Sequence, residues 1–248
     1  MKNLGKSFIV AVLLAFFMTG CSSTEDIDTS TVEGMYKLGE KYEKDERYEE
    51  AIAQFTTLKN KHPYSKLATE AELKVADIYF KREDYVEAQN EYQTFKEMHP
   101  SHVRIDYVTY QLGLSFFKQL PDTSDRDLSV AERAILYLDE VMLSYPKSAH
   151  VKDAGEHKQK TLKMLAEKED YIGNFYFIRE KWESALGRYE GLLAKYPGMG
   201  FDAKALYAAA VSAHKMKDIA KTKTYYNKLM SQHKDSPEAE KARAEIGN

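Results

Sequence analysis

The sequence predicts an all-α protein: a solenoid of five helix pairs, about ten helices, in a right-handed superhelical stack. Three observations lead to this fold class. Only 12 of the 248 residues are Gly and 6 are Pro, a composition that favours helices. Hydrophobic residues make up 43% of the chain and charged residues 30%, which is enough to bury a core. Four prolines follow segments with the same internal spacing, and twelve residues before each proline lies an alanine: Ala51, Ala88, Ala134 and Ala185.

The first segment, residues 1–20, is predicted to be a lipoprotein signal peptide that is removed. Lys2 and Lys6 form a positive region. The apolar run over residues 8–18 is too short to span a bilayer, but it has the length of a secretory signal core. The sequence Met18-Thr19-Gly20-Cys21 then resembles the lipobox of bacterial lipoproteins. The alternative is an ordinary signal peptide with an incidental cysteine.

The lipobox resemblance implies that Cys21 carries covalent lipid after cleavage. Two or more acyl chains anchor a protein stably in a membrane. Ser22, not Asp, follows Cys21, and this favours the outer membrane. Residues 21–31 are short and polar, so we expect a lipidated cysteine and a flexible tether. No cofactor is expected apart from this lipid, and a single cysteine excludes a disulfide within the chain.

A common frame of small and large residues defines the helix pairs. Gly39 on the first helix and Ala51 on the second are small, so the two helices can pack closely, and Phe55 fills the space around them. Pro63 ends the second helix. This frame resembles the tetratricopeptide repeat over nearly all of residues 32–240. Its later copies are Val75, Ala76, Tyr79, Ala88, Tyr92 and Pro100; Ile172, Gly173, Tyr176, Ala185, Tyr189 and Pro197; and Ala209, Ala210, Ala213, Thr222 and Tyr226.

The third and fifth copies depart from the frame. The third begins at Leu112-Gly113, but its alanine arrives late, because residues 119–129 form a segment rich in Pro, Asp and Ser that is typical of a loop. After Pro146, one long helix from Ala149 to about Phe177 is expected to join the third and fourth pairs. The fifth copy is degraded and lacks its proline, as expected of a capping repeat.

Two segments outside the repeat frame make the resemblance narrower. They are Ile105-Asp106-Tyr107-Val108 and Ser124-Asp125-Arg126-Asp127. Together with the lipobox, Tyr176-x2-Arg179-x2-Trp182 and Arg188-x-Glu190-Gly191, they resemble the BamD (ComL/YfiO-like) family over the whole chain. This family comprises the tetratricopeptide-repeat lipoproteins of the machinery that folds β-barrels into the outer membrane.

The resemblance implies a lipid-anchored scaffold on the periplasmic face of the outer membrane. Its implied partners are a BamA-like β-barrel protein, other assembly lipoproteins and unfolded outer-membrane proteins, which it helps to recognise and insert. The alternative is a tetratricopeptide lipoprotein that serves as an adaptor for peptidoglycan enzymes. Such an adaptor shares the signal peptide and the repeats, but it does not need the two segments outside the repeat frame.

We expect the N-terminal repeats, residues 32–118, to form the groove for a substrate peptide. In tetratricopeptide solenoids the first helix of each pair lines the concave face, and large side chains recur there outside the core frame. The alternative is that these side chains pack against neighbouring helices. The candidate groove residues are Tyr36, Leu73, Phe80, Tyr107, Tyr110 and Phe117.

We expect the loop and the C-terminal repeats, residues 119–248, to dock on the BamA-like protein and accessory proteins. Asp106, Arg126 and Asp127 either form a clasp of ion pairs that fixes the loop or contact a partner. Trp and Arg dominate interface hot spots, so Arg179, Trp182 and Arg188 are candidates for docking. Trp182 also occupies a core position of the repeat frame, and a core role is the alternative.

The sequence argues against an enzyme and against a nucleic-acid-binding protein. It contains none of the motifs GxSxG, GxGxxG, GxxxxGK[ST] or HExxH, so the usual nucleophile, phosphate and zinc sites are absent. The seven histidines are scattered, and no metal site is expected. The formal charge of −3 comes from interspersed charges, whereas nucleic-acid binding calls for a clustered basic surface.

Overall fold

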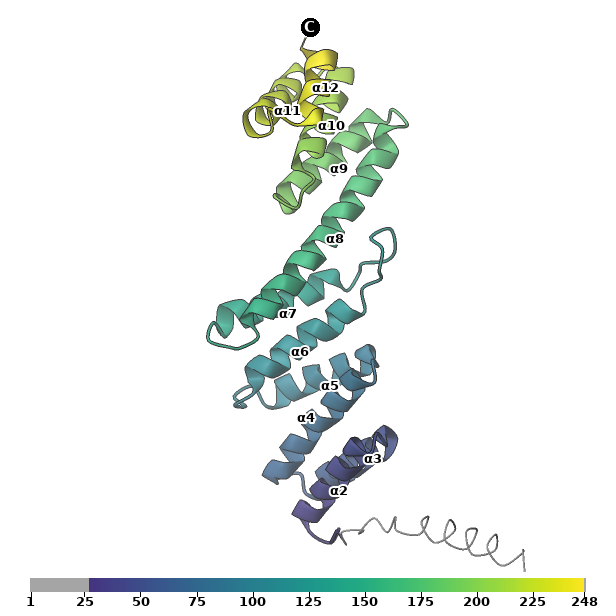
Figure 1. Ribbon diagram of the computed structural model, residues 1–248, viewed down its shortest axis with the longest axis vertical. Coiled ribbons are helices and arrows are strands. Elements are labelled where there is room, and N and C mark those ends of the chain that lie inside the picture. The colour runs from purple at the N-terminus through teal and green to yellow at the C-terminus, as the bar shows by residue number, and fades with distance from the viewer. Residues whose placement is uncertain (1–26, 248) are drawn as a thin grey trace, which may run out of the picture. The chain divides into compact units, whose positions relative to one another are not determined.

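The computed structural model describes residues 27–247, and within them it contains eleven helices and no strand (Figure 1). The all-α prediction is therefore confirmed, with one helix more than the five expected pairs. The helices are α2 (Val32–Lys44), α3 (Tyr48–Lys61), α4 (Lys66–Lys81), α5 (Tyr85–Met98), α6 (Ile105–Lys118), α7 (Ala131–Ser144), α8 (Val151–Phe177), α9 (Trp182–Lys195), α10 (Asp202–Lys215), α11 (Ile219–Gln232) and α12 (Pro237–Ile246).

The predicted signal peptide and Cys21 lie outside the described residues. The predicted tether is described only from residue 27 onward. There Ser30 donates two hydrogen bonds to the Asp28 carboxylate, and the Thr31 hydroxyl accepts a bond from the Gly34 N–H and so caps α2. The last residues of the predicted tether thus cap the first described helix. Between residues 27 and 247, no helix is long and apolar enough to cross a membrane.

The chain divides into two compact units, with the boundary between Ala71 and Glu72 inside α4. The first unit contains α2, α3 and the start of α4, and the second contains the remaining helices. The predicted functional division at residue 118 coincides with the end of α6. The right-handed superhelix and the functional division both stay predictions.

The helices of four pairs are joined by the same tight turn. Two residues before the second helix begins, one residue adopts the left-handed conformation, with φ between 56° and 65°. A left-handed residue lets the chain leave the end of a helix and reverse within a few residues. The third pair lacks this turn, because no residue between α6 and α7 has a positive φ and the predicted loop joins these helices. The four left-handed residues are Glu46, Glu83, Glu180 and Lys217.

The second helix of each of the first four pairs ends as the prolines predict. Each proline lies two residues after the last helical residue. The residue before it has φ between −125° and −132°, because the proline ring disfavours the helical conformation of its predecessor. In α11 the corresponding His233 adopts the same conformation with no proline after it. The prolines are Pro63, Pro100, Pro146 and Pro197.

The small residues of the repeat frame face large side chains across each pair. A Cβ atom on Gly39 would lie 2.5 Å from the Phe55 ring, and one on Gly173 would lie 3.0 Å from the Tyr189 ring. Both rings are fully buried. The predicted close approach is confirmed, although Gly39 faces Phe55 instead of Ala51, which is itself buried.

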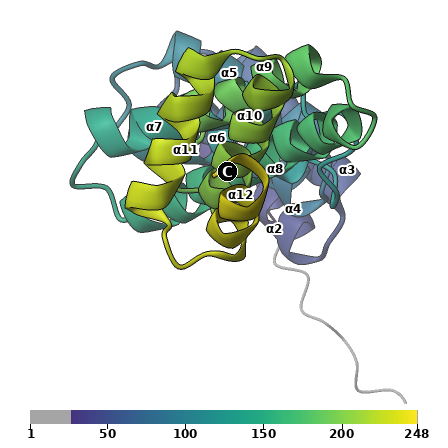
Figure 2. The same cartoon turned by 90° about the horizontal axis from the view of Figure 1, so that it is seen from above.

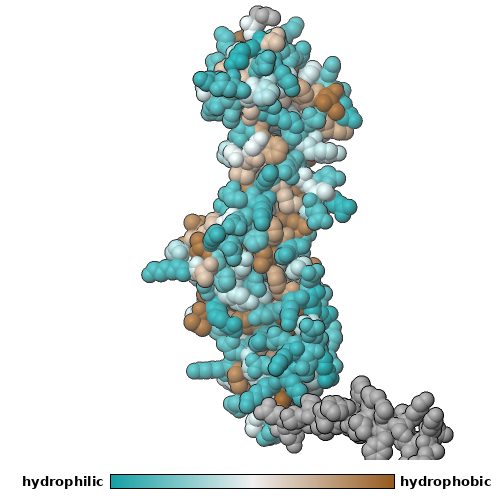
Figure 3. Space-filling model, in the orientation of Figure 1, coloured by the Kyte–Doolittle hydropathy of each residue, from teal (hydrophilic) through white to brown (hydrophobic). Residues whose placement is uncertain are grey.

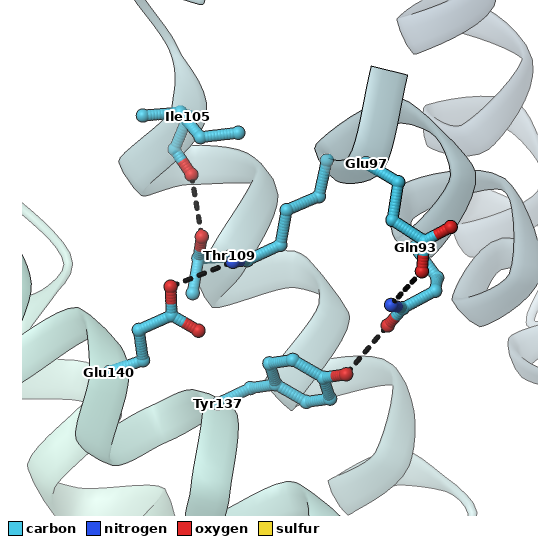
Figure 4. A network of polar contacts seen from close by, with 7 residues as sticks. Gln93, Glu97, Ile105, Thr109, Tyr137 and Glu140 are labelled. Atoms are coloured by element: carbon cyan, nitrogen blue, oxygen red, sulfur yellow. Dashed lines mark hydrogen bonds and ion pairs between the residues drawn. The ribbon is translucent and has the colours of Figure 1, made fainter. Parts of the chain in front are cut away.

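Polar contacts also join the helices of the second and third pairs (Figure 4). Tyr137 on α7 donates a 2.6 Å hydrogen bond to Gln93 on α5, and Lys96 on α5 pairs with Glu140 on α7 at 2.7 Å. Both contacts lie beside the aliphatic and aromatic core of these pairs. They add directional links to the non-directional packing of the core.

Two helices are longer or later than a regular repeat array requires. The predicted long helix is confirmed as α8, whose 27 residues extend to Phe177. The additional helix α12 packs against α10 and beside α11 (Figures 1 and 2). It begins at Pro237, with the Ser236 hydroxyl as its cap, so the late proline starts a helix instead of ending one.

Candidate functional site

The predicted groove residues are packed to different degrees. In the first unit, Tyr36 is half-buried, with its ring centroid 5.4 Å from that of Phe55. In the second unit, Leu73 has no exposed surface and Tyr110 is only 8% exposed. Both belong to one hydrophobic core cluster that joins neighbouring repeats. The prediction that they line a groove is therefore wrong for Leu73 and Tyr110.

Two aromatic residues of α6 lie against His150, which caps α8, and His157, which lies within it. The Tyr110 ring stacks on His150 with 4.7 Å between centroids and 8° between planes. Phe117 meets His157 edge-on at 4.6 Å. The alternative reading, that these rings pack against a neighbouring helix, holds for both. Pattern analysis missed the two histidines because they follow the third-pair loop in sequence and reach α6 only through the packing of α8.

Tyr107 takes part in a polar cluster between α4, α5 and α6. Asp77 accepts hydrogen bonds from the Tyr92 hydroxyl at 2.6 Å and from the Tyr107 hydroxyl at 2.8 Å. Gln111 donates to Tyr107 at 3.1 Å. Burial raises the pKa of Asp77, and burial together with the Asp77 charge raises the pKa of Tyr107 to about 12. The Tyr107 hydroxyl thus already links neighbouring repeats.

Phe80 is half-buried beside Tyr85, with the ring centroids 5.3 Å apart.

The two segments outside the repeat frame make separate contacts. Burial favours the neutral form of Asp106, but hydrogen bonds from Ser148 and from the backbone outweigh it and lower its pKa. The Lys168 ammonium on α8 donates a 2.7 Å bond to the Arg126 carbonyl oxygen. Asp127 accepts bonds from the backbone and hydroxyl of Ser129. Asp106 thus links α6 to the turn before α8, while the loop is held to the middle of α8. The Arg126 and Asp127 side chains are exposed.

A groove of about 390 Å³ lies between α8 and α9, and we call it the fourth-pair groove. Its centre is open because a Cβ atom on Gly187 or Gly191 would meet no atom within 4 Å. Arg188 lies in this groove and pairs with Glu169 at 3.3 Å, where both side chains remain partly exposed. Its lining residues are Glu169, Tyr176, Ser184, Gly187, Arg188, Gly191 and Lys195.

The other two predicted docking residues lie at the turn between α8 and α9. The exposed Arg179 guanidinium lies over the Phe175 ring at 3.7 Å from its centroid. Trp182 is half-buried and meets Phe177 edge-on at 5.5 Å. Trp182 therefore belongs partly to the core and partly to the surface. The structure brings Arg179, Trp182 and Arg188 to one pair, whereas Asp106 and Arg126 belong to the third.

Sequence reasoning did not select most residues of the fourth-pair groove. A signal was present, because Gly187 and Gly191 lie four residues apart on one helix face. Glycine inside a helix costs about 1 kcal/mol relative to alanine, so two in one helix of a glycine-poor chain need a packing or functional reason. Glu169 and Tyr176 come from α8, and only the pairing of α8 with α9 places them opposite the glycines.

Metal ligands are not clustered in the part of the chain that the structure describes. Within residues 27–247, no group of three or more His, Cys, Asp or Glu side chains is arranged to hold a metal ion. The arrangement offers packing surfaces, cationic side chains and aromatic rings, all of which serve non-covalent binding.

Two family models match this chain. The family YfiO, described as outer membrane lipoprotein, matches residues 28–206, and a tetratricopeptide repeat family matches residues 204–236. Among solved structures, the chain is similar to the TPR2AB domain–pHSP90 complex of yeast Sti1, with a TM-score of 0.43 and 16% identity over 87% of this chain and 84% of that chain.

Curated relatives carry one shared description, outer membrane protein assembly factor BamD. The protein of Pasteurella multocida (strain Pm70) is 25% identical and covers 82% of this chain and 80% of its own length. The protein of Caulobacter vibrioides is 26% identical over 80% of this chain and 67% of its own length. The protein of Vibrio cholerae is 25% identical over 79% of this chain and 85% of its own length. Since the family match extends over well more than half of the sequence, the chain belongs to the YfiO family of outer membrane lipoproteins.

Proposed function

We propose that this chain is a non-catalytic scaffold of the outer-membrane β-barrel assembly machinery. Family membership and the shared description of its relatives as outer membrane protein assembly factors support this function. The surfaces described above offer packing faces, cationic side chains and aromatic rings, which are suited to binding. A scaffold of this kind acts by holding partners and substrates together near the membrane.

The proposed location is the periplasmic face of the outer membrane, with the chain anchored by lipid on Cys21. The lipobox-like sequence and Ser22 support the anchor, and membership of an outer membrane lipoprotein family supports the compartment.

The fourth-pair groove is the proposed docking site for the BamA-like β-barrel protein, and this groove is the observation that carries the proposal. Gly187 and Gly191 let a partner's backbone or small side chains approach α9 closely. Arg188 offers a guanidinium for an acidic group of the partner, since its contact with Glu169 is long and partly exposed. Three of the half-buried aromatic candidates, Tyr36 in the first unit and Phe80 and Phe117 in the second, are each proposed to help recognise unfolded substrates.

The test is to fill the groove in the full-length lipoprotein with Gly187→Leu and Gly191→Leu. Both positions have open space, so we expect the fold to be kept while docking is lost. Recovery of a BamA-like protein in a detergent pull-down should fall at least about tenfold, which corresponds to about 1.4 kcal/mol. A matched control is Glu183→Leu, which places a leucine at an exposed position of α9 outside the groove.

Three outcomes of the pull-down separate the competing ideas. Loss of the barrel protein with the groove variants, but not with the control, supports docking at the groove. Unchanged recovery moves the docking site elsewhere and contradicts this assignment. If the unmodified chain instead recovers murein hydrolases or synthases, the scaffold is an adaptor for peptidoglycan enzymes.

A further inference from the structure

The length of α8 changes how the third and fourth pairs meet. Helix α8 has 27 residues, whereas the first helices of the neighbouring pairs, α6 and α10, have 14 each. At about 1.5 Å per residue, the additional residues extend α8 by roughly 20 Å. The third pair contacts its first half, where Lys158 pairs with Asp139 at 2.6 Å. The fourth pair uses its second half, where Gly173 lies against Tyr189.

Because the third pair contacts only the first half of α8, one face of the second half has no helix packed on it. In the pairs on either side, the same face of the first helix is covered. In a regular array, the second helix of one pair packs on the first helix of the next, as α5 packs on α6 and α9 on α10. The covered positions lie two residues before and two residues after the central small residue of the repeat frame. They are Gln111 and Ser115 around Gly113 in α6, and Ala208 and Ser212 around Ala210 in α10. Gln111 is half-buried, and the other three are buried.

The corresponding positions of the fourth pair, Tyr171 and Phe175, are large, apolar and exposed, by 60% and 43%. Ile178, which directly follows α8, is also apolar and is 64% exposed. The three residues are spaced by four and three positions, so they share one helix face. We call this face the α8 stripe. A brown patch marks the surface near the turn from α8 to α9 (Figure 3).

The first pair shows what such a face looks like when it is adapted to water. The residues of α2 that correspond to the α8 stripe are Lys37, Lys41 and Lys44, and all three are exposed. Terminal faces of repeat proteins are polar because no neighbour covers them. The fourth pair has aromatic and aliphatic side chains at the same positions, and contiguous exposed apolar residues mark interaction sites.

We propose that the α8 stripe binds an amphipathic helix of a partner protein. This helix packs on α8 as the second helix of the preceding pair packs on the first helix of the next pair in the regular part of the array. The internal precedents define the shape, because α5 on α6 and α9 on α10 are helices packed on this same face. The partner helix presents apolar residues at positions i, i+4 and i+7, together with an acidic residue. Arg179, stacked on Phe175 and exposed, is the cation that this acid meets.

The α8 stripe is continuous with the fourth-pair groove. The Phe175 ring meets the Tyr176 ring edge-on at 5.4 Å, and Tyr176 lines the groove. The inference therefore rests on the proposed function: one partner complex covers both surfaces, with a helix on the stripe. Beyond the proposed function, the inference specifies that the bound element is a helix and that it covers a surface outside the groove.

The first arm of the test is photo-crosslinking in cells that express the full-length lipoprotein. A photoreactive phenylalanine analogue replaces Tyr171 in one variant and Ile178 in another, and crosslinked peptides are identified by mass spectrometry. Both variants are expected to capture the same helical segment of an envelope protein, with apolar residues at positions i, i+4 and i+7. Ile219, which is 70% exposed on α11, serves as the control position and should not capture it.

The second arm measures recovery of the captured protein with Tyr171→Ser and Ile178→Ser combined. Because both side chains are exposed, the melting temperature should not change, while recovery should fall on the order of tenfold. Ile219→Ser is the matched control. Crosslinks to lipid, to a second copy of this chain or to an extended strand would each overturn the inference. If recovery is lost with Gly187→Leu and Gly191→Leu but not with the stripe variant, the inference fails while the proposed function stands.

Discussion

Asp77 shows at the scale of one residue how burial and hydrogen bonding oppose each other. Burial raises its pKa, while hydrogen bonds from Tyr92 and Tyr107 favour the charged form and only partly offset that effect. The folded state therefore holds the Asp77 proton to a higher pH than the unfolded chain, whose Asp pKa is about 3.9. The contribution of Asp77 to the free energy of unfolding should fall as pH rises from about 3.9 through the folded pKa, and should then become constant.

The prediction is that Asp77→Asn removes this part of the pH dependence. The free energy of unfolding, measured in urea between about pH 3 and pH 7, should lose the decline with rising pH that Asp77 contributes. Asp127 is a control of opposite sign, because hydrogen bonds from Ser129 lower its pKa. Asp127→Asn should remove stability that is present above the unfolded pKa and is lost as pH falls. Identical pH profiles for Asp77→Asn and the parent chain would contradict the argument.

The predicted site residues also differ at this scale in what the sequence could reveal. Leu73 was expected at a groove because it lies on the first helix of its pair outside the core frame, but it is completely buried in the core cluster. Arg188 was selected by residue type and resemblance, and it lies in an open groove. A repeat frame gives the face of the helix on which a residue lies, but not whether another helix covers that face.

At the scale of elements, close packing of paired helices depends on glycines whose space is already filled. A Cβ atom on Gly39 would lie 2.5 Å from the buried Phe55 ring, so α2 and α3 would have to move apart. Gly39→Ala should therefore lower the free energy of unfolding by about 1–3 kcal/mol. Gly191→Ala, where the added methyl group meets nothing, should raise it by up to about 1 kcal/mol.

Urea denaturation of the two variants and the parent chain measures both effects. The pair is informative because helix propensity favours alanine equally in both, and only packing differs. If both substitutions stabilise the protein, the approach of α2 to α3 is looser than the structure indicates.

The sequence predicted element boundaries well where a strong local signal exists. The prolines gave the ends of four helices, and the loop after α6 followed from its Pro, Asp and Ser content. Helix α12 was missed because it lies beyond the five predicted pairs, although Ser236 before Pro237 is a favourable cap. The shared left-handed turns at Glu46, Glu83, Glu180 and Lys217 carry no glycine and so gave no local signal.

At the scale of the whole molecule, attachment to the membrane depends on Cys21. Cys21→Ser removes the sulfur that would receive lipid, and we expect the protein to leave the membrane fraction or to remain unprocessed. Fractionation of cells, with metabolic labelling by a radioactive fatty acid, measures both attachment and acylation. Substitution of Ser22 by Ala keeps the cysteine and should keep the label. A labelled, membrane-bound Cys21→Ser protein would show that the anchor lies elsewhere.

The sequence by itself determined the helical class, the repeat frame, the loop, the long helix and the membership of a lipoprotein family. These properties follow from local preferences and from spacings along the chain, which are present before any helix meets another. Only the tertiary structure decided which faces are covered. The packing of α8 on α6 brings His150 onto Tyr110, whereas the length of α8 leaves Tyr171, Phe175 and Ile178 exposed. Burial depends on neighbours that are distant in sequence, so no local pattern could show it.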